Sequence, residues 1–349
     1  MKSIASRITL TLAAAGMAAM IASASRPATP ENSSAASVPN PYRAVEGWGK
    51  ALPDGRAWGS TNAVTVDDKG NVWVAERCGA NSCADSNLNP ILEFDASGKL
   101  IKSLGAGLFV VPHGVYVDKK GNIWATDNSG KDGKGQQVIE FSPDGKVLMK
   151  LGKAGVAGDG PDTFNQPDGV VIGKNGDIFV ADGHAAGTGN ARVVKFSKDG
   201  KFIKQWGGHG SGPGQFEVPH AIAIDSKGRI FVADRVNRRI QIFDQDGKFL
   251  AEWKQFGTPS GVFIDRHDVI YVADSMSQVD DATKPTYNPG FDQGIRIGSA
   301  KDGKVTAFIP IPHPAGVLTN APEGVAGDQN GGVYGADVVL KDVRKYVKQ

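Results

Sequence analysis

The sequence predicts an all-β protein, a six-bladed β-propeller, from three observations. One segment recurs six times, apolar residues alternate at period two within each copy, and the two chain ends complement each other. The copies begin at Asn62, His113, Asp168, His220, Ser260 and Glu323. Their spacings run from 40 to 63 residues, which suits one four-stranded blade per copy.

Each copy predicts four strands, of which the first two form a hairpin. HGVYVDKKGNIWATDN, from His113, alternates apolar residues on either side of a D-K-K-G turn. A third run ending in Phe-Asp or Phe-Ser, a turn such as S-P-D-G and a fourth run such as KVLMKLG follow. A helical solenoid is excluded because no segment of ten or more residues has a 3.6-residue apolar period, and because the chain has 46 Gly.

The chain ends predict how the ring closes. The last unit finishes after its third strand, DVRKYVKQ, whereas YRAVEGWG near residue 42 resembles the fourth strands of other units and has no hairpin before it. We therefore expect the N-terminal strand to complete the sixth blade and to cover an otherwise open sheet edge.

The N-terminus predicts export. Residues 1–24 have a basic start, an apolar stretch from Ile8 to Ile21 and the sequence Ala22-Ser23-Ala24, the pattern of a signal peptide with its cleavage site. Residues 25–40, rich in Ser, Pro and Ala, are expected to be a flexible linker, and residues 41–349 the propeller. Because no later stretch is apolar over the ~20 residues that a bilayer span needs, we expect a periplasmic or extracellular protein without a membrane span.

The charge balance excludes one class of partner. Lys2 and Arg7 are the only charges before the predicted cut, and their removal takes 39 basic residues to 37, against 37 acidic residues. A near-neutral chain lacks the basic surface that nucleic-acid binding requires. We expect a monomer that binds no nucleic acid.

The two cysteines, Cys78 and Cys83, lie close together in the sequence C-GANS-C. In an exported chain this spacing favours a local disulfide. The alternative, a thiolate metal site, normally has tighter spacing and more ligands.

The repeat also predicts a site at one mouth of the channel. In each unit the first strand leaves this mouth and the second returns to it, so the residue that starts the first strand and the residue fifteen positions later should lie together there. The later residues are Arg77, Asn128, Gly183, Arg235, Ser275 and Val338. Two His, an Asp and a Glu among the starting residues exceed what turning into a strand requires, although wet channel mouths also tolerate polar residues at little cost.

His113, His220 and Glu323 are the predicted metal ligands. They come from the second, fourth and sixth blades, and three such side chains are the usual protein share of a catalytic zinc site. Asp168 is a candidate fourth ligand, orienting partner or base. Arg77 and Arg235 suit a substrate carboxylate, with ion pairing to Asp168 and Glu323 as the alternative.

His184 is the remaining histidine of interest because it directly follows Gly183 on the loop at this mouth. It is a candidate general base near neutral pH, and an exposed loop histidine is the alternative.

From Trp48 to the C-terminus the chain resembles NHL-repeat propellers, and in particular bacterial relatives of peptidyl-α-hydroxyglycine α-amidating lyase. The resemblance rests on VPHGVYVD, FNQPDGVVI, IFVADGH, RVVKF, PGQFEVPHAIAID and VADRVNRRIQIFD. It implies a lyase that cleaves a C-terminal α-hydroxyglycine into a peptide amide and glyoxylate. In that family three histidines bind zinc, two arginines and a tyrosine serve catalysis, and a calcium ion is structural.

The resemblance implies specific roles for single residues. By motif, His113 and His220 match two zinc ligands, and Arg77 and Arg235 match the arginines. The chain departs from the family at three positions: Glu323 stands for the third histidine, Gly324 for an aspartate that helps to hold calcium, and His184 for the tyrosine.

Two functions from other classes remain open. A calcium-dependent lactonase on this fold would use oxygen ligands, which Glu323, Asn62 or Asn128 and Asp168 offer. A non-catalytic propeller would bind a ligand or protein at the same mouth. The metal discriminates them, because zinc favours the lyase, calcium the lactonase, and no metal the binding module.

Overall fold

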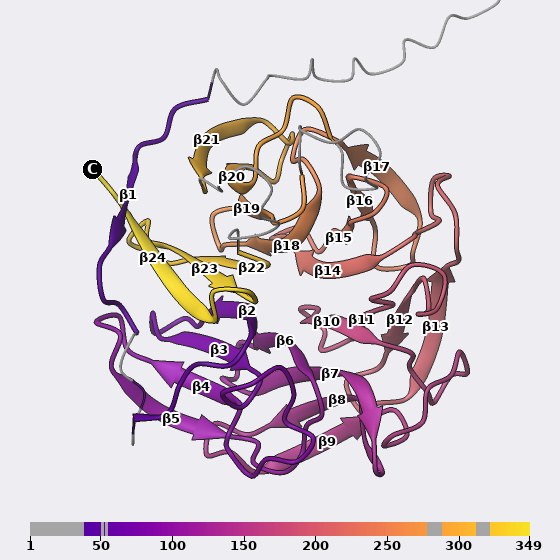
Figure 1. Ribbon diagram of the computed structural model, residues 1–349. Coiled ribbons are helices and arrows are strands. Elements are labelled where there is room, and N and C mark those ends of the chain that lie inside the picture. Colours follow the sequence, from indigo (N-terminus) through magenta and orange to yellow (C-terminus); the bar gives the residue numbers. More distant parts are fainter. Residues whose placement is uncertain (1–37, 50–51, 53–54, 278–287, 312–321) are drawn as a thin grey trace, which may run out of the picture. The chain divides into compact units, whose positions relative to one another are not determined.

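The computed structural model describes residues 38–49, 52, 55–277, 288–311 and 322–349. Their strands form six four-stranded antiparallel sheets around a central channel (Figure 1), which is the six-bladed β-propeller that the repeat predicts. The predicted signal peptide and almost all of the predicted linker lie outside the described residues. The described part of the chain contains no helix long and apolar enough to cross a membrane.

Each blade is one sheet, with its first-numbered strand innermost in blades one to five. Blade one contains β2 (Thr61–Val66), β3 (Val72–Glu76), β4 (Ile91–Phe94) and β5 (Leu100–Leu104). Blade two contains β6 (Pro112–Val117), β7 (Ile123–Lys131), β8 (Lys134–Phe141) and β9 (Val147–Leu151). Blade three contains β10 (Pro167–Ile172), β11 (Ile178–Asp182), β12 (Arg192–Phe196) and β13 (Phe202–Gly207). Blade four contains β14 (Pro219–Ile224), β15 (Ile230–Asp234), β16 (Arg239–Phe243) and β17 (Phe249–Trp253). Blade five contains β18 (Pro259–Ile264), β19 (Val269–Asp274), β20 (Gly294–Ser299) and β21 (Val305–Pro310).

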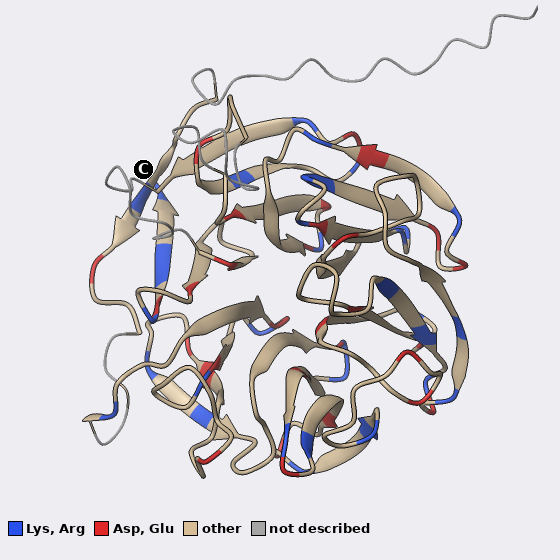
Figure 2. Ribbon diagram, turned by 45° about the vertical axis from the view of Figure 1, so that its right-hand side comes forward, with Lys and Arg blue, Asp and Glu red and all other residues tan. Residues whose placement is uncertain are grey.

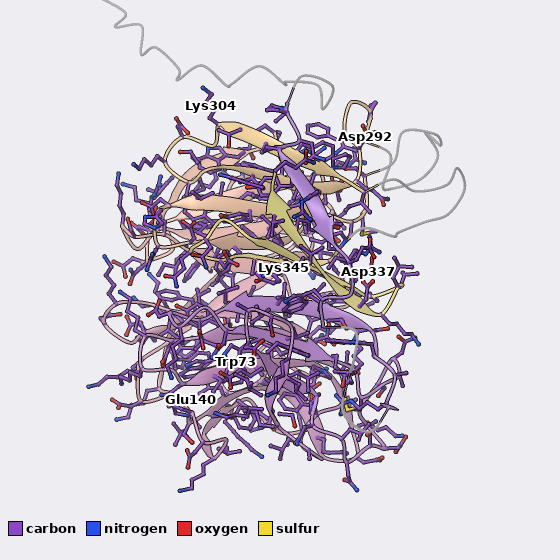
Figure 3. The ribbon with its side chains drawn as sticks, turned by 90° about the vertical axis from the view of Figure 1, so that its left-hand side faces the viewer. Trp73, Glu140, Asp292, Lys304, Asp337 and Lys345 are labelled. Carbon is purple, nitrogen blue, oxygen red and sulfur yellow. A yellow bond between two sulfur atoms is a disulfide. The ribbon has the colours of Figure 1, made fainter. Side chains whose placement is uncertain are left out.

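The sixth blade combines both ends of the propeller. Its strands, from the channel outward, are β22 (Gly324–Gly327), β23 (Val333–Asp337), β24 (Asp342–Lys348) and β1 (Tyr42–Val45). β1 pairs antiparallel with β24, with Tyr42 opposite Lys348 (Figures 1 and 3). The N-terminal strand therefore covers the outer edge of β24, as a fourth strand does in the other blades.

The core lies between blades, because each sheet packs on its neighbours with both faces. The second strands β3, β11 and β15 are buried along their whole length. One apolar cluster joins Trp124 and Val138 of blade two to Val180 and Val194 of blade three. Charged residues of both signs are distributed over all the blades (Figure 2), which agrees with the balanced composition.

A buried acid lies at the same place on the second strand of every blade, at the strand end in five blades and within the longer β7 in blade two, and binds the loops of the channel mouth. These acids are Glu76, Asp127, Asp182, Asp234, Asp274 and Asp337. In blade two, for example, Asp127 accepts the backbone N–H groups of Val110 and Val111, each at 2.7 Å. All six acids except Asp127 also pair with an arginine, as Asp234 does with Arg239 at 2.9 Å. None of the predictions from the sequence included this arrangement, which ties the mouth loops to the second strands.

Candidate metal centre

In blades one to five, the residues that start the repeat units, here called the mouth residues, lie where the register between the two innermost strands shifts. In blade three, Pro167 pairs with Asp182 and Gly169 with Ala181, so Asp168 has no partner on β11. The same interruption occurs at Asn62, at His113 with Gly114, at His220 and at Ser260. A β-bulge turns the side chain of the extra residue away from the sheet. The repeat thus provides one re-aimed side chain at the channel mouth in each of blades one to five.

A small residue follows each mouth residue because the innermost strands approach closely. A Cβ atom on Gly114 would lie 2.5 Å from the carbonyl oxygen of Asp168, and one on Gly324 would lie 2.6 Å from that of Asn62. Real Cβ atoms essentially never come this close. A side chain at position 324 would require the adjoining backbone to shift, and Gly324 itself offers no side-chain ligand for the calcium that the resemblance implies at this position.

Three imidazoles gather at the mouth from blades two, three and four. The ring centres of His113, His184 and His220 are 4.9 Å apart in all three pairs. One ligand atom from each of these histidines and one from Asp168 lie within 4.8 Å of each other. The tight group comes from neighbouring blades and contains His184. The repeat predicts ligands on alternate blades and includes Glu323, so the predicted set differs from this group.

Backbone carbonyls fix the orientation of two of these rings. Nδ1 of His113 lies 3.0 Å from the carbonyl oxygen of Asp168, and Nδ1 of His220 lies 2.7 Å from that of Ser260. A carbonyl oxygen only accepts hydrogen bonds, so Nδ1 carries the proton in both rings. In the neutral imidazole this leaves the lone pair on Nε2, the arrangement of a metal-ligating histidine.

Burial keeps both rings neutral. It lowers the pKa of His113 to about 3, against the opposing effect of Asp168. Burial, aided by the charge of Arg235, also lowers the pKa of His220. Nε2 of each ring is buried and makes no hydrogen bond.

Unpaired buried polar atoms concentrate at this mouth. Ten such side-chain atoms occur in the described residues, and five belong to Asn62, Arg77, His113, His220 and Arg235. A buried polar group without a partner costs about 1–3 kcal/mol, so native proteins rarely leave one unexplained. Half of the unpaired buried side-chain polar atoms of the described residues therefore lie at this one mouth.

Asp168 orients His184. Nδ1 of His184 lies 3.1 Å from both carboxylate oxygens, and Nδ2 of Asn128 donates to Oδ1 at 3.1 Å. Burial opposes ionisation of Asp168, but the surrounding imidazoles and the hydrogen bond from His184 outweigh it and lower the pKa of Asp168. An ionised Asp168 fixes the proton of His184 on Nδ1 and leaves Nε2 as the free nitrogen.

Glu323 and Arg235 form an ion pair beside the imidazoles. Nη1 of Arg235 donates to Oε1 of Glu323 at 3.0 Å. The same oxygen lies 3.3 Å from Nε2 of His220 without hydrogen-bond geometry. Burial raises the pKa of Glu323, but His220 and Arg235 outweigh burial and hold it well below its usual value. Arg235 thus pairs with Glu323, which is the alternative to binding a substrate carboxylate that the sequence left open.

Arg77 differs from Arg235 because its guanidinium makes no hydrogen bond or ion pair with any described residue. Burial lowers its pKa, against the charges of Glu323 and Asp168. Arg77 is therefore the cation at this mouth that is open to an anionic ligand.

The predicted disulfide between Cys78 and Cys83 is present (Figure 3). It lies on the loop that begins with Arg77, after β3. The same loop is attached to blade two, since Ser82 Oγ and the backbone N–H of Cys83 both donate to the carbonyl of Val110. Disulfides persist in oxidising compartments, which is consistent with export.

Comparison with known proteins supports the fold and the resemblance. A family described as a 6-bladed beta-propeller matches residues 174–255. Mouse peptidyl-glycine alpha-amidating monooxygenase is 39% identical over 147 residues, which cover 40% of this chain and 14% of the mouse protein. Human NHL repeat-containing protein 3 is 32% identical over 203 residues, covering 56% of this chain and 55% of the human protein. Drosophila melanogaster peptidyl-alpha-hydroxyglycine alpha-amidating lyase 1 is 32% identical over 207 residues, covering 51% and 36%.

Solved structures share the fold at low identity. A virginiamycin B lyase from Staphylococcus aureus has a TM-score of 0.53 at 17% identity, with 87% of each chain covered. A gluconolactonase from Xanthomonas campestris has a TM-score of 0.57 at 12% identity, with 84% of this chain and 87% of that chain covered. The class is thus a six-bladed β-propeller with a histidine-rich channel mouth. Within that class the chain resembles NHL-repeat proteins and peptidyl-α-hydroxyglycine α-amidating lyases, and the alignments span at most about half of these three relatives.

Proposed function

We propose that this protein is an exported zinc-dependent lyase that cleaves the C–N bond of a C-terminal α-hydroxyglycine and releases a peptide amide and glyoxylate. The observation that carries the proposal is the pair of buried, neutral imidazoles, His113 and His220, whose Nε2 atoms make no hydrogen bond. The relatives named for this reaction support the choice of chemistry.

His113 and His220 would hold the metal, with His184 and Asp168 close enough to complete its coordination and Glu323 beside His220. Imidazole nitrogen suits zinc, whereas calcium prefers oxygen ligands. When bound, zinc supplies Lewis acidity at a substrate oxygen. The lactonase alternative is weaker because nitrogen donors occupy the centre of the mouth.

The substrate is a peptide or small molecule with a terminal carboxylate, and Arg77 would bind that carboxylate. Its fork of N–H donors matches two carboxylate oxygens, and no described side chain occupies it. Arg235, tied to Glu323, would position that acid and add positive charge to the same mouth.

The reaction also needs a group that accepts the proton of the substrate hydroxyl. As this O–H bond breaks, the carbonyl of glyoxylate forms, the C–N bond breaks and the amide nitrogen takes up a proton. The sequence suggested His184 or Asp168 as the base. Asp168 is enclosed and already accepts from His184 and Asn128, whereas Oε2 of Glu323 makes no hydrogen bond in the described structure. We therefore add Glu323 to the candidates.

The proposal is tested by incubating the zinc-loaded protein with α-hydroxyhippurate and with longer peptides that end in α-hydroxyglycine, and measuring glyoxylate. We expect turnover that disappears after chelation and returns when zinc is added. No turnover above the metal-free control would reject the lyase. Calcium-dependent opening of a lactone by the same sample would favour the lactonase instead.

A further inference from the structure

We infer that His184 is the third metal ligand of this protein, so that the site consists of three imidazoles from three neighbouring blades, with Glu323 outside it. The inference rests on the proposed metal site and specifies its ligand set. His184 lies on the loop between β11 and β12, outside the six residues that start the repeat units.

The spacing of the rings matches one shared metal. Three imidazoles bound to a tetrahedral ion at about 2.0–2.1 Å have ring centres about 5 Å apart. The observed separation is 4.9 Å for each of the three pairs. Three rings that bind one ion have similar separations, and the three separations here are equal.

Each ring is also anchored in the way that a metal ligand requires. All three Nδ1 atoms contact oxygen acceptors, which are the carbonyls of Asp168 and Ser260 and the carboxylate of Asp168. Such partners fix the tautomer and aim Nε2 at the metal. Asp168 serves two rings at once, through its backbone and its side chain.

The loop that carries His184 is held in place. Gly183 has a φ of +142°, and a Cβ atom there would lie 1.3 Å from the carbonyl oxygen of Asn190. The backbone N–H of Gly183 donates to the carbonyl of Gln166, and that of Ala185 donates to Oε1 of Gln166 at 2.8 Å. The side chain of His184 therefore enters the mouth from a restrained backbone.

Glu323 has a different set of contacts. Its Oε1 accepts from Arg235, and the acid does not belong to the group whose ligand atoms lie within 4.8 Å of each other. The charge-assisted hydrogen bond from Arg235 occupies one carboxylate oxygen of Glu323 and holds the acid toward the arginine.

Zinc binding distinguishes the two assignments without any assay of activity. Chelator-treated wild-type protein and the His113→Ala, His184→Ala, Glu323→Gln and Asp168→Asn variants would be titrated with zinc against a chromophoric chelator. We expect His184→Ala and His113→Ala each to weaken binding by at least about 100-fold, and Asp168→Asn by about 10–100-fold. Glu323→Gln should remain within about threefold of wild type. X-ray absorption at the zinc edge should count three imidazoles in wild type and two in any zinc-bound His184→Ala.

The matched control is His267→Ala, which removes an exposed histidine from the β18–β19 turn and should leave zinc binding unchanged. Unchanged thermal unfolding of the metal-free variants shows that the propeller is intact. Zinc affinity near wild type in His184→Ala, or a loss in Glu323→Gln as large as in His113→Ala, overturns the inference but leaves the metal site. A wild-type protein that binds no zinc overturns both.

Discussion

Blades three and four have the same second strand, Ile-Phe-Val-Ala-Asp, in β11 and β15. The loops that follow differ, with nine residues between Asp182 and Arg192 and four between Asp234 and Arg239. In the longer loop the second residue is His184, which joins the imidazole group. In the shorter loop the second residue is Val236, which is 40% exposed.

The hydrogen bonds at the base of the two loops are the same despite this difference in length. Arg192 Nε bonds Asp182 at 2.8 Å, and Arg239 Nε bonds Asp234 at 2.9 Å. An asparagine from each loop adds a further bond to the same acid, Asn190 at 2.7 Å and Asn237 at 2.8 Å. The comparison teaches that a buried Asp–Asn–Arg set maintains the blade, while the length of the loop above it decides which side chain reaches the channel.

The largest effect is expected from removing the acid of this set. Asp234→Ala removes the buried carboxylate that accepts from Arg239, Asn237 and the backbone N–H of Glu217, and only the partly exposed Glu252 still pairs with Arg239. Breaking a buried ion pair on one side costs about 3–5 kcal/mol. Asp182→Ala should cost a similar amount, although its loop is longer. Urea denaturation measures both.

The control for these variants is Asp246→Ala, whose side chain is exposed and should change stability by less than about 0.5 kcal/mol. A decrease in the free energy of unfolding below about 1 kcal/mol in both acid variants would show that the loops do not depend on the buried Asp–Asn–Arg set.

Exchanging the loops tests whether zinc affinity can be lost while the stability of the blade is kept. Replacing residues 183–191 by the four residues 235–238 of blade four removes His184 and keeps an asparagine for Asp182. We expect zinc affinity to fall by at least about 100-fold, equivalent to about 2.7 kcal/mol, with the free energy of unfolding changed by less than about 1 kcal/mol. Isothermal titration with zinc and urea denaturation measure the two quantities. Full zinc affinity in the exchanged protein would show that blade three adds no ligand.

Arg77 sharpens the comparison at the same position of a third blade. The residue fifteen positions after the mouth residue is Gly183 in blade three, Arg235 in blade four and Arg77 in blade one. Because Arg77 is the open cation, Arg77→Lys should lower kcat/KM by about 10–100-fold through loss of the two-point carboxylate contact. Steady-state kinetics with an α-hydroxyglycine peptide tests this, and an unchanged zinc content is the control. An unaltered KM would assign carboxylate binding elsewhere.

The repeat was sufficient to predict the propeller because period-two alternation and turn residues are local properties of each unit. It also brought Asn62, His113, Asp168 and His220 to one mouth, since the same position of every unit faces the channel. The repeat does not contain the contacts between units. Asp234 belongs to the repeated segment and Arg239 begins the next strand of the same blade, but the loop carbonyls and N–H groups that they bind come from outside the repeated segment.

The grouping of the histidines was also beyond the sequence. Three ligands on alternate blades satisfy the symmetry of the ring, but His184 lies on an insertion that follows no repeat position. Its place depends on Gly183 and on the bonds of its loop to Gln166. The signal in the sequence was the histidine directly after Gly183, and it suggested a base as readily as a ligand.

The smallest effect is expected from the disulfide. The loop of blade three is restrained by hydrogen bonds to Gln166, whereas the loop that begins with Arg77 has the bond between Cys78 and Cys83. These cysteines are five residues apart, and closing so short a loop stabilises the fold by no more than about 2 kcal/mol. Replacing both by Ala avoids a buried hydroxyl and should lower the thermal midpoint slightly, while KM for a carboxylate substrate rises several-fold because Arg77 loses its restraint. Calorimetry and kinetics on the double variant, with Arg77→Lys as reference, measure both effects. A fall in stability as large as that of Asp234→Ala, with KM unchanged, would mean that the disulfide holds the blade and not the site.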